Sequence, residues 1–480
     1  MDASASPPPR RAASLRDGER LDRWTVALFA LVNGVVLVNA LRHDPTIGYD
    51  ADSHVAYVRT LAEGRLPTFW DTTEFFSPPL PYVVPALLLR AGLGEAAALR
   101  GALIAQVAVS VALTLTVLRL AGRLSAHIAV RRGALALLAL APVYFKSFAF
   151  LRGEPYAACF VALVLEHALG TLGMSRVPLR RVVGLGALGG FALLSRQWGA
   201  AALPAVALLA LQRARAEPAL ARERLTSIVV ASILALQAGG WFYAYLHLRS
   251  GSAMAFNRAH AESFSLTNQP PEFYAGAGNG RLFSDPVRPG FPNQLGPILL
   301  SEAWGDYWCY WAVWGRDLAA DRWVSGPELE GRLLAGEPAT SLATNRAAVA
   351  AYLGRANLLA LAPTVLALVA LALGTRSALA ALTHPVDDPD RGATFVLTVT
   401  ILGTLVGYGW FLVMYPNPGK GDTIKATYLL QIFPLWAVLG GAFLERLRSL
   451  SRAAWLTAVA ILAVVFVHGA PLLFSRYVGG

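Results

Sequence analysis

Charged residues are scarce in this chain of 480 residues: they make up 15% of it, whereas hydrophobic residues make up 55%. So few charges cannot cover a water-soluble protein of this size, which excludes the soluble enzyme folds. Apolar runs of about 20 residues recur along the chain, and each is long enough to cross the hydrocarbon core of a bilayer. The composition therefore predicts an all-α, polytopic membrane protein.

Cysteine is rare as well. The chain has two, Cys159 and Cys309, and their wide separation in the sequence fits neither a disulfide framework nor a zinc site. The formal charge is +11, but the arginines that produce it gather in short segments between the apolar runs. Membrane topology explains this distribution better than nucleic-acid binding does. We therefore exclude nucleic acid as a partner.

Eleven apolar segments are expected to span the membrane: residues 24–41, 98–118, 133–150, 155–174, 182–194, 199–212, 226–248, 347–374, 393–414, 427–444 and 453–474. With a cytoplasmic N-terminus, the short segments that fall inside carry 16 Arg against 6 Asp or Glu, as the positive-inside rule requires: 119–132, 175–181, 213–224, 375–391 and 445–452. A single span over residues 182–212 would move the last three of these segments outside. Residues 80–95 hold two prolines and are shorter than the roughly 20 residues that a bilayer needs, so we expect an interfacial or re-entrant helix there.

Four regions follow from this map. Residues 1–23 are polar and are predicted to be a disordered cytoplasmic tail ahead of a retained signal anchor. Residues 24–248 form an N-terminal transmembrane module, whose first external loop, 42–97, is expected to hold the catalytic site. Residues 249–346 form a large external loop or subdomain, and residues 347–480 a C-terminal transmembrane module. We expect a multi-pass protein of the cell membrane with its site on the external face.

The first external loop places two carboxylates and a histidine, Asp50, Asp52 and His54, within five positions. In a helix, Asp50, His54 and Tyr57 would share one face and could point together into a cavity. A carboxylate at this place could serve a membrane enzyme as a catalytic base. Acids beside a bilayer are also typical of a solvated loop, so the acids alone leave both interpretations open.

The loop continues with Glu74-Phe75-Phe76-Ser77-Pro78-Pro79-Leu80-Pro81-Tyr82, and the whole stretch resembles the first external loop of the GT-C glycosyltransferases. The shared pattern is an acidic pair, a histidine with Tyr-Val, a Gly-x-Leu-Pro turn and then Pro-Pro-Leu-x-Tyr. In the family pattern the second acid directly follows the first, whereas this chain has Ala51 there and its second acid at Asp52. The resemblance implies Asp50 as the catalytic carboxylate with Asp52 and His54 beside it, and it implies substrate-binding roles for Tyr57, Glu74, Pro78, Pro79 and Tyr82.

A second cluster, Arg152 and Glu154, lies at the external end of the third and fourth predicted spans. A snorkelling arginine paired with a nearby acid would account for it. The segment also resembles the Arg-x-Asp or Arg-x-Glu element of GT-C proteins, which implies a second acid near the sugar donor. Arg196, between the fifth and sixth predicted spans, is a weaker candidate for binding a phosphate.

Lysine occurs three times, at Lys146 and at Lys420 and Lys425 in the short external loop 415–426. Lysines in an external loop oppose the positive-inside rule, whereas a phosphate at the headgroup level would account for them. The Lys425-x-x-Tyr428 segment is also similar to the corresponding GT-C segment. Interfacial anchoring by Lys420 and Tyr428 is the alternative interpretation.

The long loop contains Trp304-Gly305-Asp306-Tyr307-Trp308-Cys309-Tyr310-Trp311. Such aromatic density is typical of an interfacial belt. Trp304 and Trp308 could instead stack on a sugar or belong to a lid, because the GT-C family closes its site with loops in this region. Asp306 lies between them as a further substrate-binding candidate.

The resemblance implies a membrane glycosyltransferase that uses a polyprenyl-phosphate sugar, similar to protein O-mannosyltransferases and aminoarabinose transferases. In an inverting transfer, Asp50 would take the proton of an acceptor hydroxyl on a glycan, lipid or protein, while lysine or arginine stabilises the leaving phosphate. No cofactor is expected, although Asp50, Asp52 and Glu154 leave a divalent metal open. The alternatives are a lipid or solute transporter or flippase, and a surface-glycan polymerase or ligase. Transport sites usually lie near the bilayer midplane, whereas these charges gather at one face.

Overall fold

The computed structural model describes residues 21–257, 260–338, 340–386 and 388–479. All but the last three residues of the predicted cytoplasmic tail lie outside these ranges. At the start of the described chain, the Asp22 carboxylate accepts hydrogen bonds from the backbone N–H groups of Trp24 and Thr25. This N-cap satisfies donors that the first turn of a helix leaves unpaired, so the first apolar helix begins at Arg23.

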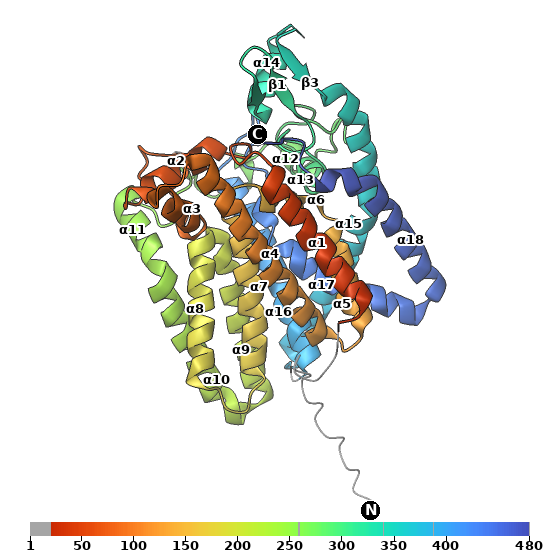
Figure 1. Ribbon diagram of the computed structural model, residues 1–480. Helices are drawn as coiled ribbons and strands as arrows, with labels where there is room; N and C mark the ends of the chain where they lie inside the picture. Colours follow the sequence, from red (N-terminus) through yellow and green to blue (C-terminus); the bar gives the residue numbers. More distant parts are fainter. Residues whose placement is uncertain (1–20, 258–259, 339, 387, 480) are drawn as a thin grey trace, which may run out of the picture.

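Helices dominate the described residues (Figure 1). The N-terminal half contains α1 (Arg23–Arg42), α2 (Ala51–Ala62), α3 (Leu80–Arg90), α4 (Glu95–Leu124), α5 (Ile128–Ala139), α6 (Pro142–Ala149), α7 (Glu154–Leu172), α8 (Leu179–Ser195), the 3₁₀ turn η1 (Gln197–Ala201), α9 (Ala202–Ala216), α10 (Pro218–Ala235), the π-helical turn η2 (Leu236–Gly240) and α11 (Trp241–Ser250). The C-terminal half contains η3 (Leu266–Asn268), α12 (Pro271–Ala275), α13 (Leu295–Trp304), α14 (Gly326–Leu334), α15 (Arg346–Thr383), α16 (Pro389–Met414), η4 (Ala426–Leu429), α17 (Ile432–Leu450), α18 (Arg452–Gly469) and η5 (Ala470–Leu473).

Each of the eleven predicted spans coincides with a helix, a bent pair of helices or a helix with a π-helical turn. By length and composition, seven of the described helices can cross a membrane, or eight if the pair α5 and α6, bent by 65°, is one span. The helices α8 and α9 have 17 and 15 residues, and α17 ends in charged residues. At 1.5 Å per residue, α8 reaches about 25 Å, less than the roughly 30 Å core of a bilayer. The polytopic all-α fold is therefore confirmed, whereas the number of eleven spans is not.

Residues 80–95, predicted as an interfacial or re-entrant segment, form the short helix α3, a turn and the first residue of α4, Glu95. The helix α3 has 11 residues and is too short to span a bilayer. It packs between α2 and α4 and closes the first loop against the bundle. The helix α3 thereby joins α2 of the first loop to α4 of the bundle.

A small sheet caps one end of the bundle and was not predicted. Its antiparallel strands β1 (Gly315–Asp317), β2 (Arg322–Val324) and β3 (Leu342–Thr344) lie in the order β2-β1-β3, and α14 packs beside them (Figure 1). Gly315 pairs with Val324 on one side and Thr344 on the other. Strands of three residues are too short for an alternating hydrophobic pattern to be visible in the sequence.

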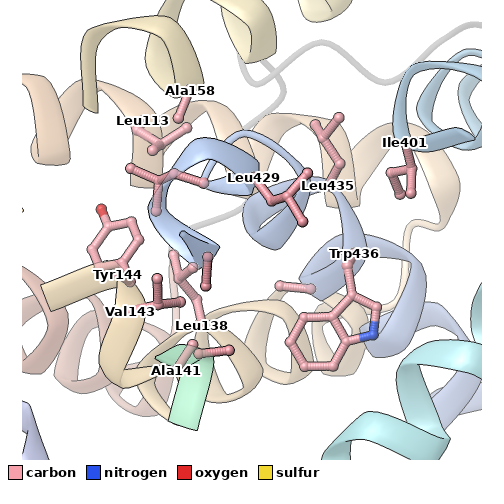
Figure 2. Close-up of a cluster of buried hydrophobic side chains, with 14 of the residues drawn as sticks. Leu113, Leu138, Ala141, Val143, Tyr144, Ala158, Ile401, Leu429, Leu435 and Trp436 are labelled. Atoms are coloured by element: carbon pink, nitrogen blue, oxygen red, sulfur yellow. The ribbon is translucent and has the colours of Figure 1, made fainter. Parts of the chain in front are cut away.

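The helix α17 lies at the centre of the core. It packs so closely on α5 that a Cβ atom added to Gly441 would lie 2.6 Å from the carbonyl oxygen of Val130. Figure 2 shows the surrounding cluster, to which Leu138 of α5, Tyr144 of α6, and Leu435 and Trp436 of α17 belong. This packing fixes the end of α6, which Arg152 follows in the chain, and the turn η4, which Lys425 precedes.

The two ends of the described chain lie at opposite ends of the bundle. The helix α1 begins at the lower end in Figure 1, and the C-terminus lies at the upper end, below the sheet. The turn between α9 and α10, which is rich in arginine, also lies at the lower end. The arrangement agrees with an odd number of crossings, and the predicted orientation places the lower end in the cytoplasm.

This orientation predicts different labelling of two new cysteines. We expect Lys420→Cys to react with a membrane-impermeant maleimide in intact cells, and Arg222→Cys on the first turn of α10 to react only after permeabilisation. Both side chains are exposed, and the native Cys159 and Cys309 are buried, so the unmodified protein serves as a low-background control. Labelling of Arg222→Cys in sealed cells would reverse the topology.

Candidate active site

The three sequence clusters come together at one end of the bundle. The segment before α2 supplies Asp50, the segment between α6 and α7 supplies Arg152, and the segment before η4 supplies Lys425. Glu154 on the first turn of α7 and Arg196 at the end of α8 complete the charged cluster. Residues more than 350 positions apart in the sequence are thus in direct contact, because the Nζ atom of Lys425 lies 2.7 Å from Oδ2 of Asp50.

Asp50 lies immediately before a helix and not inside one. It is the N-cap of α2 and has a left-handed backbone with φ of 54°, a conformation that aspartate tolerates better than most residues. Its carboxylate makes no capping bond and is 40% exposed. Desolvation disfavours its charged form, but the positive charges of Lys425 and Arg152 outweigh this effect and hold the pKa of Asp50 below its usual range. The carboxylate is therefore ionised at neutral pH.

Lys425 is more enclosed than its partner. Its side chain is 10% exposed, and the Nζ atom lies 5.2 Å and 5.7 Å from the ring centroids of Tyr49 and Tyr428. Its backbone N–H donates to the hydroxyl of Tyr408 at 2.9 Å. Burial opposes the charge of Lys425, but the Asp50 carboxylate compensates and raises the pKa of the ammonium. The pair forms the outer edge of the charged cluster.

Behind this pair, two arginines and two acids alternate in a buried row. Arg152 donates through Nε and Nη2 to the two oxygens of Glu154 at 3.0 and 3.1 Å. Nε of Arg196 lies 3.2 Å from Glu154, and its Nη1 donates to Glu74 at 3.0 Å. Arg152 and Glu154 are 0% exposed, so the pair is enclosed by protein and does not reach a bilayer surface as a snorkelling pair would. The charges of both arginines are balanced within the row.

The remaining residues of the first loop pack the site from behind. His54 is buried and its Nδ1 lies 2.7 Å from the hydroxyl of Tyr82, while Tyr57 stacks on Tyr82 at 4.0 Å between ring centroids. Burial lowers the pKa of His54 to about 4, so it is neutral at pH 7. His54 and Tyr57 are thus buried on α2, whereas Asp50 precedes the helix and is partly exposed. Pro78 and Pro79 are buried where α3 begins, and Asp52 lies exposed on the first turn of α2.

The aromatic loop buttresses the site from within the protein. Both oxygens of Asp306 are used: Oδ1 accepts from the backbone N–H of residue 310, and Oδ2 accepts from those of residues 311, 312 and 313, at 2.7 to 3.0 Å. Trp308 is buried and donates through Nε1 to the carbonyl of Ile424, next to Lys425. Asp306 and Trp308 thus shape the loop and support the lysine, and neither faces solvent as a sugar platform would.

An apolar cavity of about 430 Å³ begins beside the charged cluster. It is lined by residues of α13, α15, α16, η4 and α17, among them Trp304, Ala367, Ala426 and Leu429. Leu368 of α15, also in the lining, is 60% exposed, which indicates that the cavity opens at the side of the bundle. Trp304 therefore faces an apolar space next to Tyr428 and Lys425.

Lys420 is exposed and lies at the tip of its loop, so it does not join the cluster. Three contributors were missed as site residues: Tyr49, Lys146 and Glu302. Lys146 and Glu302 form an ion pair that is 0% exposed, and the Tyr49 hydroxyl donates to the same carboxylate. A lysine and an acid inside otherwise apolar segments were the sequence signal for this pair, because such charges are costly without a partner.

A metal at Asp50, Asp52 and Glu154 finds no support in the geometry. Glu154 is bound by two arginines, Asp50 by Lys425, and Asp52 lies on the surface. Within the described ranges, no three His, Cys, Asp or Glu side chains gather closely enough to hold a metal ion.

The buried row predicts a large stability effect at Glu154. We expect Glu154→Gln to lower the free energy of unfolding by about 3–5 kcal/mol, because it leaves two enclosed arginines with one acid. Thermal unfolding of the purified protein in detergent measures the effect. Asp52→Asn is the control, since an exposed substitution should change stability by about 0.5 kcal/mol or less. Equal melting temperatures for both variants would contradict the buried row.

Comparisons with known proteins find solved structures with a similar fold but no relative by sequence. No family model and no curated protein matches the chain. Among solved structures, ArnT from Cupriavidus metallidurans bound to undecaprenyl phosphate matches at 16% identity with a TM-score of 0.50, covering 94% of this chain and 65% of ArnT. The apo form of ArnT gives 0.48, covering 94% and 64% at 16% identity. The oligosaccharyltransferase AglB from Archaeoglobus fulgidus gives 0.45, covering 94% and 56% at 12% identity.

The likeness to lipid-bound ArnT extends over nearly the whole chain, which spans 65% of the length of that protein. At 16% identity it concerns the course of the backbone and not the residues of the site. The polytopic helical fold expected from the sequence is thereby confirmed. The chain is a polytopic helical membrane protein that shares the fold of ArnT.

Proposed function

We propose that the chain is a membrane glycosyltransferase of the GT-C type. It would move a sugar from a polyprenyl-phosphate donor to an acceptor hydroxyl on the external face, with inversion at the anomeric carbon. The observation that carries this proposal is a partly exposed carboxylate, Asp50, paired with Lys425, whose neighbour in the chain, Ala426, lines an apolar cavity. The structure of ArnT with undecaprenyl phosphate supports a lipid-phosphate ligand for this fold.

The chemistry needs one base and one cation. Asp50 takes the proton of the acceptor hydroxyl while the acceptor oxygen forms a bond to the anomeric carbon. The bond from that carbon to the phosphate oxygen breaks, and the polyprenyl phosphate leaves with the electron pair. Lys425 stabilises the negative charge on the leaving phosphate. A single weak base suffices because the phosphate is a good leaving group and the reactants are held in place.

In this scheme the Asp50 carboxylate and the donor phosphate compete for the Lys425 ammonium. Without donor, its ammonium is 2.7 Å from Asp50 and neutralises it. A donor phosphate competes for the same ammonium and weakens that contact, so the Asp50 carboxylate becomes a better base when donor is bound. Arg152 and Arg196 already have acid partners, which favours Lys425 over both arginines as the phosphate ligand.

The cavity suits the lipid part of the donor. Its lining is almost entirely apolar, and it meets the charged cluster at η4, where Ala426 and Leu429 flank Tyr428. Burying a prenyl chain yields about 0.8 kcal/mol per methylene group. A lipid phosphate lying with its head at Lys425 and its chain in the cavity would be held by both. A transporter would place such charges near the bilayer midplane, whereas these lie at one end of the bundle.

The base assignment predicts a loss of rate without a loss of fold. We expect Asp50→Asn to lower transfer by about 10²–10⁴-fold, because the variant cannot accept the proton. Asp52→Asn should retain most activity, since that side chain is exposed beside the site. The measurement is transfer or hydrolysis in proteoliposomes with a panel of polyprenyl-phosphate sugars. Turnover by Asp50→Asn near the wild-type rate would remove Asp50 as the base.

The cation assignment predicts weaker donor binding. We expect Lys425→Gln to lose about 1.5–3 kcal/mol of affinity for undecaprenyl phosphate, the range for a hydrogen bond to a charged group. Lys420→Gln is the matched control and should bind normally in detergent, where interfacial anchoring has no bilayer to act on.

The same binding assay tests the lipid cavity. Ala367→Phe fills the cavity without touching Lys425 and should also weaken binding, whereas Leu358→Phe on an exposed part of α15 should not. Unchanged affinity in Lys425→Gln and Ala367→Phe would move the donor away from this end of the bundle.

A further inference from the structure

Tyr49 links the exposed carboxylate of the site to the protein interior. It directly precedes Asp50 and is itself buried. Its carbonyl accepts a hydrogen bond from Nη1 of Arg152 at 3.2 Å, and its ring lies edge-on to Phe150 and Tyr310. Gly48, with φ of 153°, brings the backbone so close to Phe150 that an added Cβ would meet that ring at 3.1 Å. Tyr49 is thus fixed through its backbone and its ring.

The hydroxyl of Tyr49 is fixed as well. It donates to the carboxylate of Glu302 on α13, and the same carboxylate is ion-paired with Lys146 on α6. Nζ of Lys146 also donates to the carbonyls of Glu302 and Gly305 at 3.0 and 3.3 Å. The second carboxylate oxygen of Glu302 accepts from the backbone N–H of Trp308 at 3.3 Å. Every partner is buried, so this arrangement has a single geometry.

Stability alone is a poor reason for such a pair. Desolvation of two charges costs several kcal/mol per ion, and hydrophobic replacements of buried ion pairs are often neutral or stabilising. A buried ion pair can instead fix the orientation of its neighbours, because each oxygen and each proton has one partner. Here the neighbour that it orients is Tyr49, whose ring centroid also lies 5.2 Å from Nζ of Lys425.

We propose that Lys146 and Glu302 are positioning residues for the transfer reaction, acting through Tyr49 on both members of the Asp50–Lys425 pair. The inference rests on the proposed function. The hydroxyl anchor holds the Tyr49 backbone, which sets the left-handed turn at Asp50, and it holds the ring, on which the Lys425 ammonium lies. A misplacement of about 1 Å at a reacting group can cost about 10²-fold in rate.

Tyr49→Phe is the central test, because it removes the anchoring hydroxyl and keeps the ring. We expect kcat to fall about 10- to 100-fold, while KM for the polyprenyl-phosphate sugar stays within about threefold. Tyr144→Phe is the matched control: it also removes a buried hydroxyl hydrogen bond, to Ser110, but lies away from Asp50. It should transfer at the wild-type rate.

The pH profile separates positioning from plain destabilisation. Charged or titratable groups that act on the Asp50 carboxylate are Lys425, Arg152, His54, Glu74, Tyr310 and Tyr428. If the pair loosens, Lys425 lowers the pKa of Asp50 less, so the acid limb of kcat/KM moves to higher pH in Tyr49→Phe. The infrared carboxylate band of Asp50, assigned by difference from Asp50→Asn, should titrate at the same higher pH. A merely less stable protein would lose amplitude without this shift.

A second variant keeps the test decisive if a single charge change prevents folding. Lys146→Met combined with Glu302→Gln removes both charges together, so no unpaired charge stays buried. We expect this double variant to fold and to lose kcat as Tyr49→Phe does, and Tyr49→Phe should add little to it, because all three act as one unit. A wild-type kcat in the folded double variant would contradict the shared role of Lys146 and Glu302.

The outcomes distinguish the two proposals. If the wild-type protein transfers no sugar from any donor of the panel, the proposed function fails and this inference with it. If the wild-type protein is active and Tyr49→Phe matches it in kcat and in acid limb, the positioning role alone is overturned.

Discussion

The contact between Asp50 and Lys425 depends on a balance of charge that the whole site shares. Arg152, Arg196 and Lys425 face Asp50, Glu74 and Glu154, so the cationic and acidic groups are equal in number. In a poorly hydrated interior each charge needs a partner, and the enclosed members are therefore fixed on one another. Only the outermost pair is open to exchange, because Asp50 is partly exposed. Under the proposed function, the chemistry of the site would begin at that pair.

Much of this could be read from the sequence, because charges in apolar surroundings are costly and therefore informative. Five ionisable residues near the ends of apolar runs were therefore candidate site residues: Asp50, Arg152, Glu154, Arg196 and Lys425. The runs themselves predicted the helices, since hydrophobic length is the strongest local signal that a bilayer imposes. Their convergence follows from the fold alone, because no local pattern relates position 50 to position 425.

What the sequence did not reveal lies in contacts whose partners no local pattern identifies. Arg196 was a weaker candidate for binding a phosphate, and its acid partners Glu74 and Glu154 lie in other segments of the chain. Arg152 pairs with Glu154, the nearby acid that one interpretation of the sequence had given it. Asp306 accepts four backbone N–H groups of its own loop. The sequence indicated no role for Tyr49, because the role of a tyrosine hydroxyl depends on its acceptor, and the acceptor, Glu302, lies in another segment of the chain. The strands of the small sheet were too short for any periodicity to be detected.

One helix connects the site to the apolar cavity. The helix α13 contributes Leu299, Leu300 and Trp304 to the apolar cavity, while Glu302 on the same helix binds Lys146 and Tyr49. Side chains of one short, packed helix move together, since close packing transmits displacement. Under the proposed function, a prenyl chain in the cavity would press on the helix that anchors the residue before the base. The lipid tail and the catalytic carboxylate are then linked by a single packed element.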